Sequence, residues 1–202
     1  MELRKEKLFT SSKIAKAGIF SALSFILYMF LKFPLPFFPS FLEFNFSDLP
    51  ALIGGFMLGP IYGGIIVLIK VLIKLPFTST TGVGEFADLL IGWAYIIPAS
   101  IIYKRNKNIK GAVIALIVGS ISSIIMSMIA NRYILIPFYS LFLTFETIVG
   151  MCKAIFENIT TANFYSYYLF LSVLPFNLLR CVIISLLTFL LYKKISRLMS
   201  KM

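Results

Sequence analysis

The chain contains no histidine, and carboxylates are scarce, with 8 Asp and Glu residues against 19 Lys and Arg residues. Without histidine, the sequence cannot form a Ser-His-Asp triad, a histidine general base or most types of zinc site. Its two cysteines, Cys152 and Cys181, lack the Cys-x-x-Cys spacing of redox and metal motifs, so we interpret them as small apolar packing residues. The few carboxylates show no spacing typical of acid/base pairs or metal ligands, and no P-loop occurs. We therefore predict a protein without catalytic residues, bound metal or resident cofactor.

Charge of either sign is rare, because 59% of the residues are hydrophobic and only 13% are charged. A soluble domain is about half apolar and about a quarter charged, so the composition predicts an all-α integral membrane protein. The length of 202 residues fits a single membrane domain, 1–202. The net charge of +11 comes largely from cation clusters at 4–16, 104–110 and 193–201. Each cluster flanks an apolar run, which is typical of cytoplasmic segments of membrane proteins and not of a nucleic-acid-binding surface.

Six apolar stretches predict six transmembrane helices, with both termini in the cytoplasm. Four of them approach or exceed the roughly 20 residues that span a bilayer. The segment 47–75 is divided at Leu58-Gly59-Pro60, because Gly-Pro is a strong turn signal and because the division keeps the cation clusters on one side. Its first half is short, so it must be tilted or buried by its neighbours. The predicted helices are 14–33, 47–59, 60–75, 85–103, 111–135 and 169–192, and the predicted outer loops are 34–46, 76–84 and 136–168.

Polar side chains gather on the predicted outer side of this apolar chain. They come from the first two outer loops and from the outer ends of the helices. Amides, hydroxyls and a cation among Phe, Leu and Ile side chains suit a flat heteroaromatic ligand, which needs apolar walls for its faces and fixed polar groups for its edge. The candidate binding residues are Glu43, Asp48, Thr81, Gly82, Glu85, Asn131, Asn177 and Arg180.

Several polar residues also have simpler interpretations. Asp48 stands where it could cap a helix N-terminus, and Asn131 could hold two helices together. The long side chains of Lys32, Lys70 and Lys74 are expected to extend toward a membrane interface. These residues therefore carry a structural alternative beside the binding hypothesis.

Arg180 is harder to explain structurally, because a cation one to two turns inside an apolar helix requires a partner or a ligand. Asn177 lies three residues before it and on the same helical face. We therefore favour a binding role for this pair.

The first helix carries a stripe of small residues. Ala15, Gly18 and Ala22 follow one another at steps of three and four. Such a stripe lets another helix approach closely. The sequence leaves open whether that helix belongs to this chain or to a partner.

Several motifs of the chain occur in the same order as in a known family. The chain resembles the substrate-binding S components of energy-coupling factor (ECF) vitamin transporters, and more narrowly their riboflavin-specific branch. The resemblance covers nearly the whole chain. It rests on Phe46-Ser47-Asp48-Leu49-Pro50-Ala51-Leu52-Ile53-Gly54-Gly55, Leu58-Gly59-Pro60, Thr80-Thr81-Gly82-Val83-Gly84-Glu85, Tyr103-Lys104-Arg105 and Pro175-Phe176-Asn177-Leu178-Leu179-Arg180.

The resemblance implies a bacterial cell-membrane protein that holds a flavin near the outer face, under the first outer loop. It implies that Glu43, Asn131, Asn177 and Arg180 contact the flavin. It further implies that the small-residue stripe docks a transmembrane T component driven by two ATPase subunits. Membrane lipid surrounds the protein, and FMN is a further possible ligand. Two alternatives stay open: an S component for another vitamin or precursor, and a membrane-embedded lipid-modifying enzyme that uses Glu85 and Asp88.

Overall fold

Apolar helices make up most of the computed structural model, which describes residues 10–199 and the side chains of residues 10–191. The helical segments are α1 (Ser11–Phe30), α2 (Asp48–Leu58), α3 (Pro60–Lys74), η1 (Leu75–Phe77), α4 (Val83–Arg105), α5 (Ile109–Ala130), η2 (Asn131–Leu135), α6 (Ile136–Tyr139), α7 (Phe145–Lys153), α8 (Phe164–Tyr167), η3 (Tyr168–Val173) and α9 (Leu174–Met199). The strands are β1 (Lys32–Pro34) and β2 (Glu43–Asn45).

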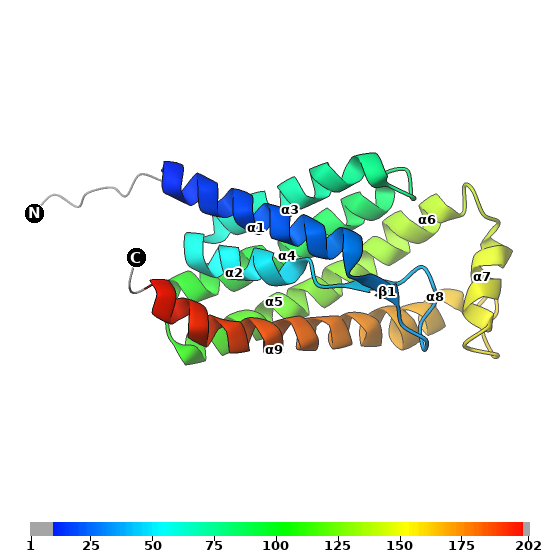
Figure 1. Cartoon of the computed structure of the whole chain (residues 1–202). Helices are drawn as coiled ribbons and strands as arrows, with labels where there is room; N and C mark the ends of the chain where they lie inside the picture. Colours follow the sequence, from blue (N-terminus) through cyan, green and yellow to red (C-terminus); the bar gives the residue numbers. More distant parts are fainter. Residues whose placement is uncertain (1–9, 200–202) are drawn as a thin grey trace, which may run out of the picture.

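The long helices run back and forth along one axis, and α7 lies across one end of the bundle (Figure 1). Within the described residues, five helical segments are long and apolar enough to cross a membrane. The sixth, α2, has 11 residues, too few to span roughly 30 Å of hydrocarbon alone. Most of its residues are buried by neighbouring helices, as the sequence predicted for this short segment. The start of α1 and the end of α9 lie at the same end of the bundle (Figure 1).

Two helices are longer than the sequence predicted, because each continues through a π-helical segment. The predicted helix 111–135 runs through α5, η2 and α6, from Ile109 to Tyr139. The predicted helix 169–192 begins at α8, which continues through η3 into α9. A π-helical turn takes up an extra residue without ending the helix, and such turns occur frequently at functional sites. Both segments lie toward the end of the bundle away from the α4–α5 connection (Figure 1).

The first outer loop contains a short β-hairpin that the sequence analysis missed. Strand β1 pairs antiparallel with β2, with Phe33 opposite Phe44. Three-residue strands give too little alternation to be recognised from sequence. The hairpin and α7 cover one end of the bundle, where Cys152 is fully buried. Burial raises the pKa of this thiol to about 12, so it stays protonated and packs as an apolar side chain.

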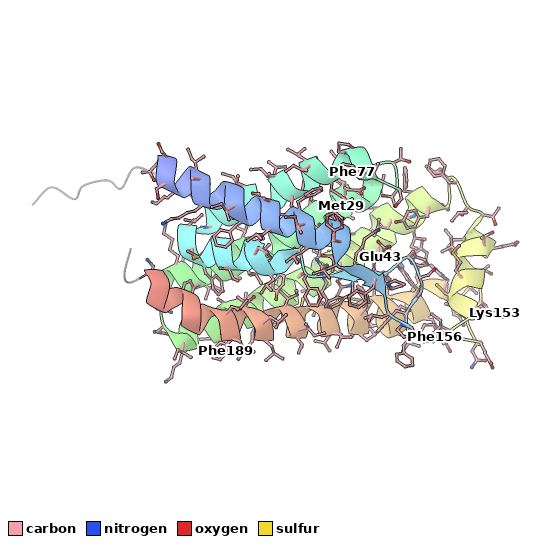
Figure 2. The ribbon with its side chains drawn as sticks, viewed as in Figure 1. Met29, Glu43, Phe77, Lys153, Phe156 and Phe189 are labelled. Carbon is pink, nitrogen blue, oxygen red and sulfur yellow. The ribbon has the colours of Figure 1, made fainter. Side chains whose placement is uncertain are left out.

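Side chains fill the space between the helices (Figure 2), and most of the buried apolar ones belong to two large clusters. One joins α1, α2, α3, α4, α5 and α9, with Ile66, Tyr95 and Ile96 among its fully or almost fully buried members. The other joins the hairpin, α7 and η3 around Phe44 and Tyr168.

Helices α2 and α3 are joined by a single residue, Gly59, at the predicted turn. Its backbone, with φ 103° and ψ 171°, lies in a region that is essentially restricted to glycine. Pro60 then begins α3, where its missing N–H costs no hydrogen bond. The Gly-Pro pair thus reverses the chain with no added loop.

We expect Gly59→Ala to lower the free energy of unfolding by about 1–3 kcal/mol, because alanine is strained in this conformation. A Cβ at Gly59 would meet no atom within 4 Å, so the cost is conformational. Gly18→Ala is a matched control, because its Cβ also meets open space but its backbone is helical. Thermal unfolding in detergent should separate the two variants. Equal melting temperatures would contradict the assigned turn geometry.

Candidate functional site

Lys70 lies in the C-terminal part of α3 and is fully buried. Its ammonium group is 2.7 Å from Ser47 Oγ, 2.8 Å from Asp48 Oδ1 and 3.0 Å from Asp88 Oδ2. Ser47 Oγ and Asp48 Oδ1 accept hydrogen bonds from this group, whereas Asp88 Oδ2 adds a charge contact without a hydrogen bond in the described part of the chain. A cation removed from water in this way is held by pairing and hydrogen bonding together.

Arg180 joins the same two carboxylates from the other side. Its Nη2 contacts Asp48 Oδ2 and lies 3.6 Å from Asp88 Oδ1. We call Asp48, Lys70, Asp88 and Arg180 the ion quartet. Its two positive and two negative charges cancel, and its members come from α2, α3, α4 and α9. The quartet therefore fixes the relative positions of four helices.

Three simple interpretations from the sequence are wrong. Asp48 does not cap α2, because it lies in the first turn of the helix and binds Lys70 and Arg180. Lys70 and Lys74 do not extend to an interface, since their exposed fractions are 0% and 5%. Carboxylates from α2 and α4 face them in the interior, and pairing there is the alternative to reaching water.

A pocket opens beside the quartet, with a volume of about 150 Å³. Five of the predicted binding residues line it: Glu43, Glu85, Asn131, Asn177 and Arg180. Asp48 lies behind the wall, within the quartet. Thr81 and Gly82 lie in the preceding turn, outside the lining, and both have positive φ. The structure thus brings together side chains from the hairpin, α4, η2 and α9, and their roles as ligand contacts stay predictions.

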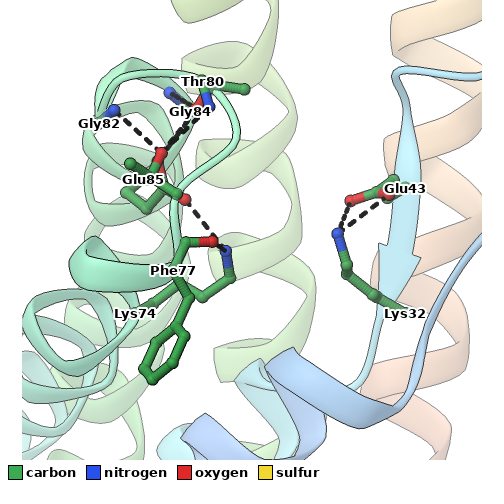
Figure 3. Close-up of polar contacts among 9 residues, drawn as sticks. Lys32, Glu43, Lys74, Phe77, Thr80, Gly82, Gly84 and Glu85 are labelled. Atoms are coloured by element: carbon green, nitrogen blue, oxygen red, sulfur yellow. Dashed lines mark hydrogen bonds and ion pairs between the residues drawn. The ribbon is translucent and has the colours of Figure 1, made fainter.

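Two ion pairs flank the pocket (Figure 3). Lys32 Nζ is 2.8 Å from Glu43 Oε2 across the hairpin, where both side chains are partly exposed. Lys74 Nζ is 3.2 Å from Glu85 Oε1, and this pair is buried. Thr78 and Thr80 donate hydrogen bonds of 2.7 and 3.0 Å to Glu85 Oε2. Each charged side chain that lines the pocket is therefore paired with a charge of opposite sign.

The two pocket asparagines each bond to their own helix. Asn131 Nδ2 donates to Ser127 O, and Asn177 Nδ2 donates to Val173 O, both at 2.8 Å. These bonds turn the amide nitrogen of each carboxamide toward its own helix backbone. Asn177 Oδ1 forms none of the hydrogen bonds found within the described residues, so it is available to a ligand. Arg180 Nε is likewise buried without a hydrogen-bond partner in that part of the chain.

The first outer loop contributes an aromatic and an aliphatic side chain to the pocket wall. Phe41 and Leu42, between β1 and β2, line it directly. The ring centroid of Phe41 is 6.3 Å from that of Tyr139 and 5.8 Å from that of Tyr168. The pocket volume of about 150 Å³ is below the roughly 300 Å³ at which small-molecule pockets begin.

Sequence reasoning missed three residues around the site. Lys70 and Tyr28 complete it from α3 and α1: the ring of Tyr28 lines the pocket and lies 5.5 Å from Lys70 Nζ. Tyr168 contacts Asn131 from behind the wall. A signal existed for Lys70, because a cation in an apolar helix is a functional-site candidate by default. Tyr28 and Tyr168 gave none, since aromatic residues are common in such helices.

The small-residue stripe of α1 faces away from the bundle. Ala15, Gly18 and Ala22 are exposed, and a Cβ at Gly18 would meet no atom within 4 Å. The small residues that pack inward are Ala17, Ser21 and Ser24. Packing within this chain therefore does not explain the stripe, and its surface is free for a partner.

Comparison with known proteins gives a consistent result. A family model described as "ECF transporter, substrate-specific component" matches residues 12–192. Riboflavin transporter RibU of Staphylococcus aureus (strain TCH60) is 30% identical over 198 residues, which cover 98% of this chain and 97% of that protein. Riboflavin transporter FmnP of Bacillus subtilis (strain 168) is 26% identical over 186 residues, 91% of each chain.

The fold has a solved counterpart. The S component of a bacterial ECF transporter matches with a TM-score of 0.72 and 31% identity, over 93% of this chain and 96% of that one. These relatives are named as transporters and not as enzymes, so the alternative of a lipid-modifying enzyme is set aside.

We expect Lys70→Met to cost about 3–5 kcal/mol of folding free energy, because it leaves two buried carboxylates to share Arg180. Lys32→Met makes the same change in the partly exposed Lys32–Glu43 pair, where the cost should stay within about 1 kcal/mol. Unfolding by SDS, followed by circular dichroism, measures both. A Lys70→Met protein as stable as Lys32→Met would show that the quartet does not hold the bundle together.

Proposed function

Because this chain belongs to the family of substrate-specific components of ECF transporters, we propose that it is the riboflavin-binding subunit of a vitamin uptake transporter in a bacterial cell membrane. The observation that carries the proposal is the pocket beside the ion quartet, which combines fixed amide and guanidinium groups with aromatic walls. Two curated relatives that cover nearly the whole chain are named as riboflavin transporters.

The free hydrogen-bonding groups suit the polar edge of a flavin. The isoalloxazine ring system presents an imide, in which an N–H lies between two carbonyls. Asn177 offers a carbonyl oxygen for that N–H, and the neighbouring Arg180 offers N–H donors for a carbonyl. Asn131 has one N–H left after its bond to Ser127. The apolar side chains Leu135, Ile91 and Phe176 then receive the ring faces.

Binding requires the loop between β1 and β2 to open and close again. Phe41 and Leu42 must leave the pocket to admit the ring system and can then return over it. Asn45 links the hairpin to the quartet, since its Oδ1 accepts a 2.8 Å hydrogen bond from Ser47 Oγ, which in turn binds Lys70. The Asn45 end of the hairpin therefore stays attached to the quartet while Phe41 and Leu42 move.

Transport requires partners, because this chain has no P-loop of its own. In our proposal, the exposed stripe Ala15, Gly18 and Ala22 docks a T component, and two ATPases drive the S component to topple in the membrane. Small residues at that surface allow close helix–helix approach. Both termini lie in the cytoplasm in this arrangement, with the pocket facing outside.

Riboflavin should bind the purified, detergent-solubilised chain at one equivalent with submicromolar affinity, measured by quenching of flavin fluorescence. 3-Methylriboflavin should bind at least about tenfold more weakly, because the methyl group removes the N–H that Asn177 Oδ1 accepts. Asn177→Ala should weaken riboflavin binding. It should also reduce the ratio between the affinities for riboflavin and 3-methylriboflavin.

Equal affinity for riboflavin and 3-methylriboflavin would contradict the assigned edge contact while leaving riboflavin as the ligand. A folded, ligand-free protein that quenches neither flavin would contradict the riboflavin proposal. It would favour an S component for another vitamin or precursor, which a ligand screen by thermal shift would identify.

FMN should bind at least about tenfold more weakly than riboflavin, because the cations Lys32, Lys74 and Arg180 around the pocket are already paired and a phosphate dianion left without a cation is costly to desolvate. Glu43→Gln removes the partner of Lys32, so the ratio of the FMN and riboflavin dissociation constants should fall. Glu146→Gln removes an exposed carboxylate of α7 and serves as the control. A ratio that stays constant in Glu43→Gln would contradict this electrostatic explanation.

A further inference from the structure

Tyr168 stands directly behind Asn131. Its hydroxyl donates a 2.5 Å hydrogen bond to Asn131 Oδ1. Tyr168 is fully buried and is not among the pocket-lining residues, whereas Asn131 lines the pocket and is 3% exposed. The bond therefore lies inside the pocket wall, between a residue that can touch a ligand and one that cannot.

Two hydrogen bonds together fix the Asn131 carboxamide. Nδ2 donates to Ser127 O at 2.8 Å, while Oδ1 accepts from Tyr168. A flipped carboxamide would place its oxygen against the Ser127 carbonyl, so only one orientation satisfies both partners. One N–H of Nδ2 remains for the pocket, and its direction is set by the Ser127 and Tyr168 bonds together.

Tyr168 is itself held firmly. Its ring is stacked on Phe164, with centroids 5.2 Å apart and planes at 13°. It begins the π-helical segment η3, just as Asn131 begins the π-helical segment η2. Two facing π-helical segments are thus joined by one hydrogen bond at the pocket wall. A buried polar contact of this kind specifies one arrangement of the helices that carry it.

We propose that Tyr168 is a positioning residue for ligand recognition: its hydroxyl orients the Asn131 carboxamide so that the free N–H faces the flavin. This inference rests on the proposed riboflavin function and adds a residue that does not touch the ligand. It predicts that the loss of one hydroxyl outside the pocket weakens binding through Asn131 alone.

The test compares Tyr168→Phe with Tyr165→Phe. The second variant removes a hydroxyl from a half-buried tyrosine one turn earlier, whose hydroxyl forms none of the hydrogen bonds found within residues 10–191. Tyr168→Phe should weaken riboflavin binding about tenfold, the effect of losing one well-formed hydrogen bond, and Tyr165→Phe should leave it unchanged. In an Asn131→Ala background, Tyr168→Phe should change the affinity less than about twofold, because a double-mutant cycle isolates the shared interaction.

If Tyr168→Phe lowers the riboflavin affinity equally in the wild-type and Asn131→Ala proteins, Tyr168 acts through the fold and the proposal is wrong. Unchanged riboflavin binding in Tyr168→Phe would also overturn it. A second measurement does not depend on riboflavin. In ligand-free protein labelled with ¹⁵N-asparagine, the Asn131 side-chain NH₂ resonances, identified by their loss in Asn131→Ala, should shift or broaden in Tyr168→Phe but not in Tyr165→Phe. Unchanged resonances would overturn the positioning role even if the riboflavin proposal had failed.

Discussion

The need to neutralise charge inside an apolar bundle governs this structure. Lys70 and Arg180 are nearly or completely buried, and each is tolerated only because Asp48 and Asp88 lie beside it. Satisfying two cations with two shared carboxylates requires α2, α3, α4 and α9 to meet at one level. The quartet contributes little net stabilisation over a well-packed apolar core. Its effect is to define one arrangement of helices and a rigid floor for the pocket.

The charge balance of the pocket follows from the ion quartet beside it. Because the quartet is neutral and the Lys32–Glu43 and Lys74–Glu85 pairs flank it, the pocket is rich in polar groups but has no excess charge. Such a site suits a neutral ligand with a hydrogen-bonding edge. The hairpin that covers it is tied to the floor through Asn45 and Ser47. In our proposal, the loop between β1 and β2 opens while the groups that contact the ligand stay in place.

Backbone hydrogen bonds orient the two asparagine side chains of the pocket. Asn131 begins one π-helical segment and Asn177 follows another. Each donates one side-chain N–H to a backbone carbonyl of its own helix. What remains free for a ligand is therefore set by local helix geometry. Tyr168 extends this control to a residue outside the pocket. In our proposal, recognition depends on these supporting residues as much as on the side chains that line the pocket.

The sequence alone determined the membrane class and the family, because both follow from composition and from local motifs such as Leu58-Gly59-Pro60 and Pro175 to Arg180. The family match and the solved S component confirm the resemblance. The sequence also singled out Glu43, Glu85, Asn131, Asn177 and Arg180, since polar groups stand out in apolar runs, and the structure gathers these five around one pocket.

Only the tertiary structure decided how these residues are partnered. Asp48 and Lys70 are 22 positions apart and Asp48 and Arg180 are 132 apart. Local patterns therefore suggested a cap and an interfacial lysine where the fold makes a buried ion quartet. The same holds for Tyr168, whose role depends on a hydrogen bond to a residue 37 positions away. Local sequence signals indicate which side chains are unusual, but the charge and hydrogen-bond partners that define their chemistry come from distant segments brought together by folding.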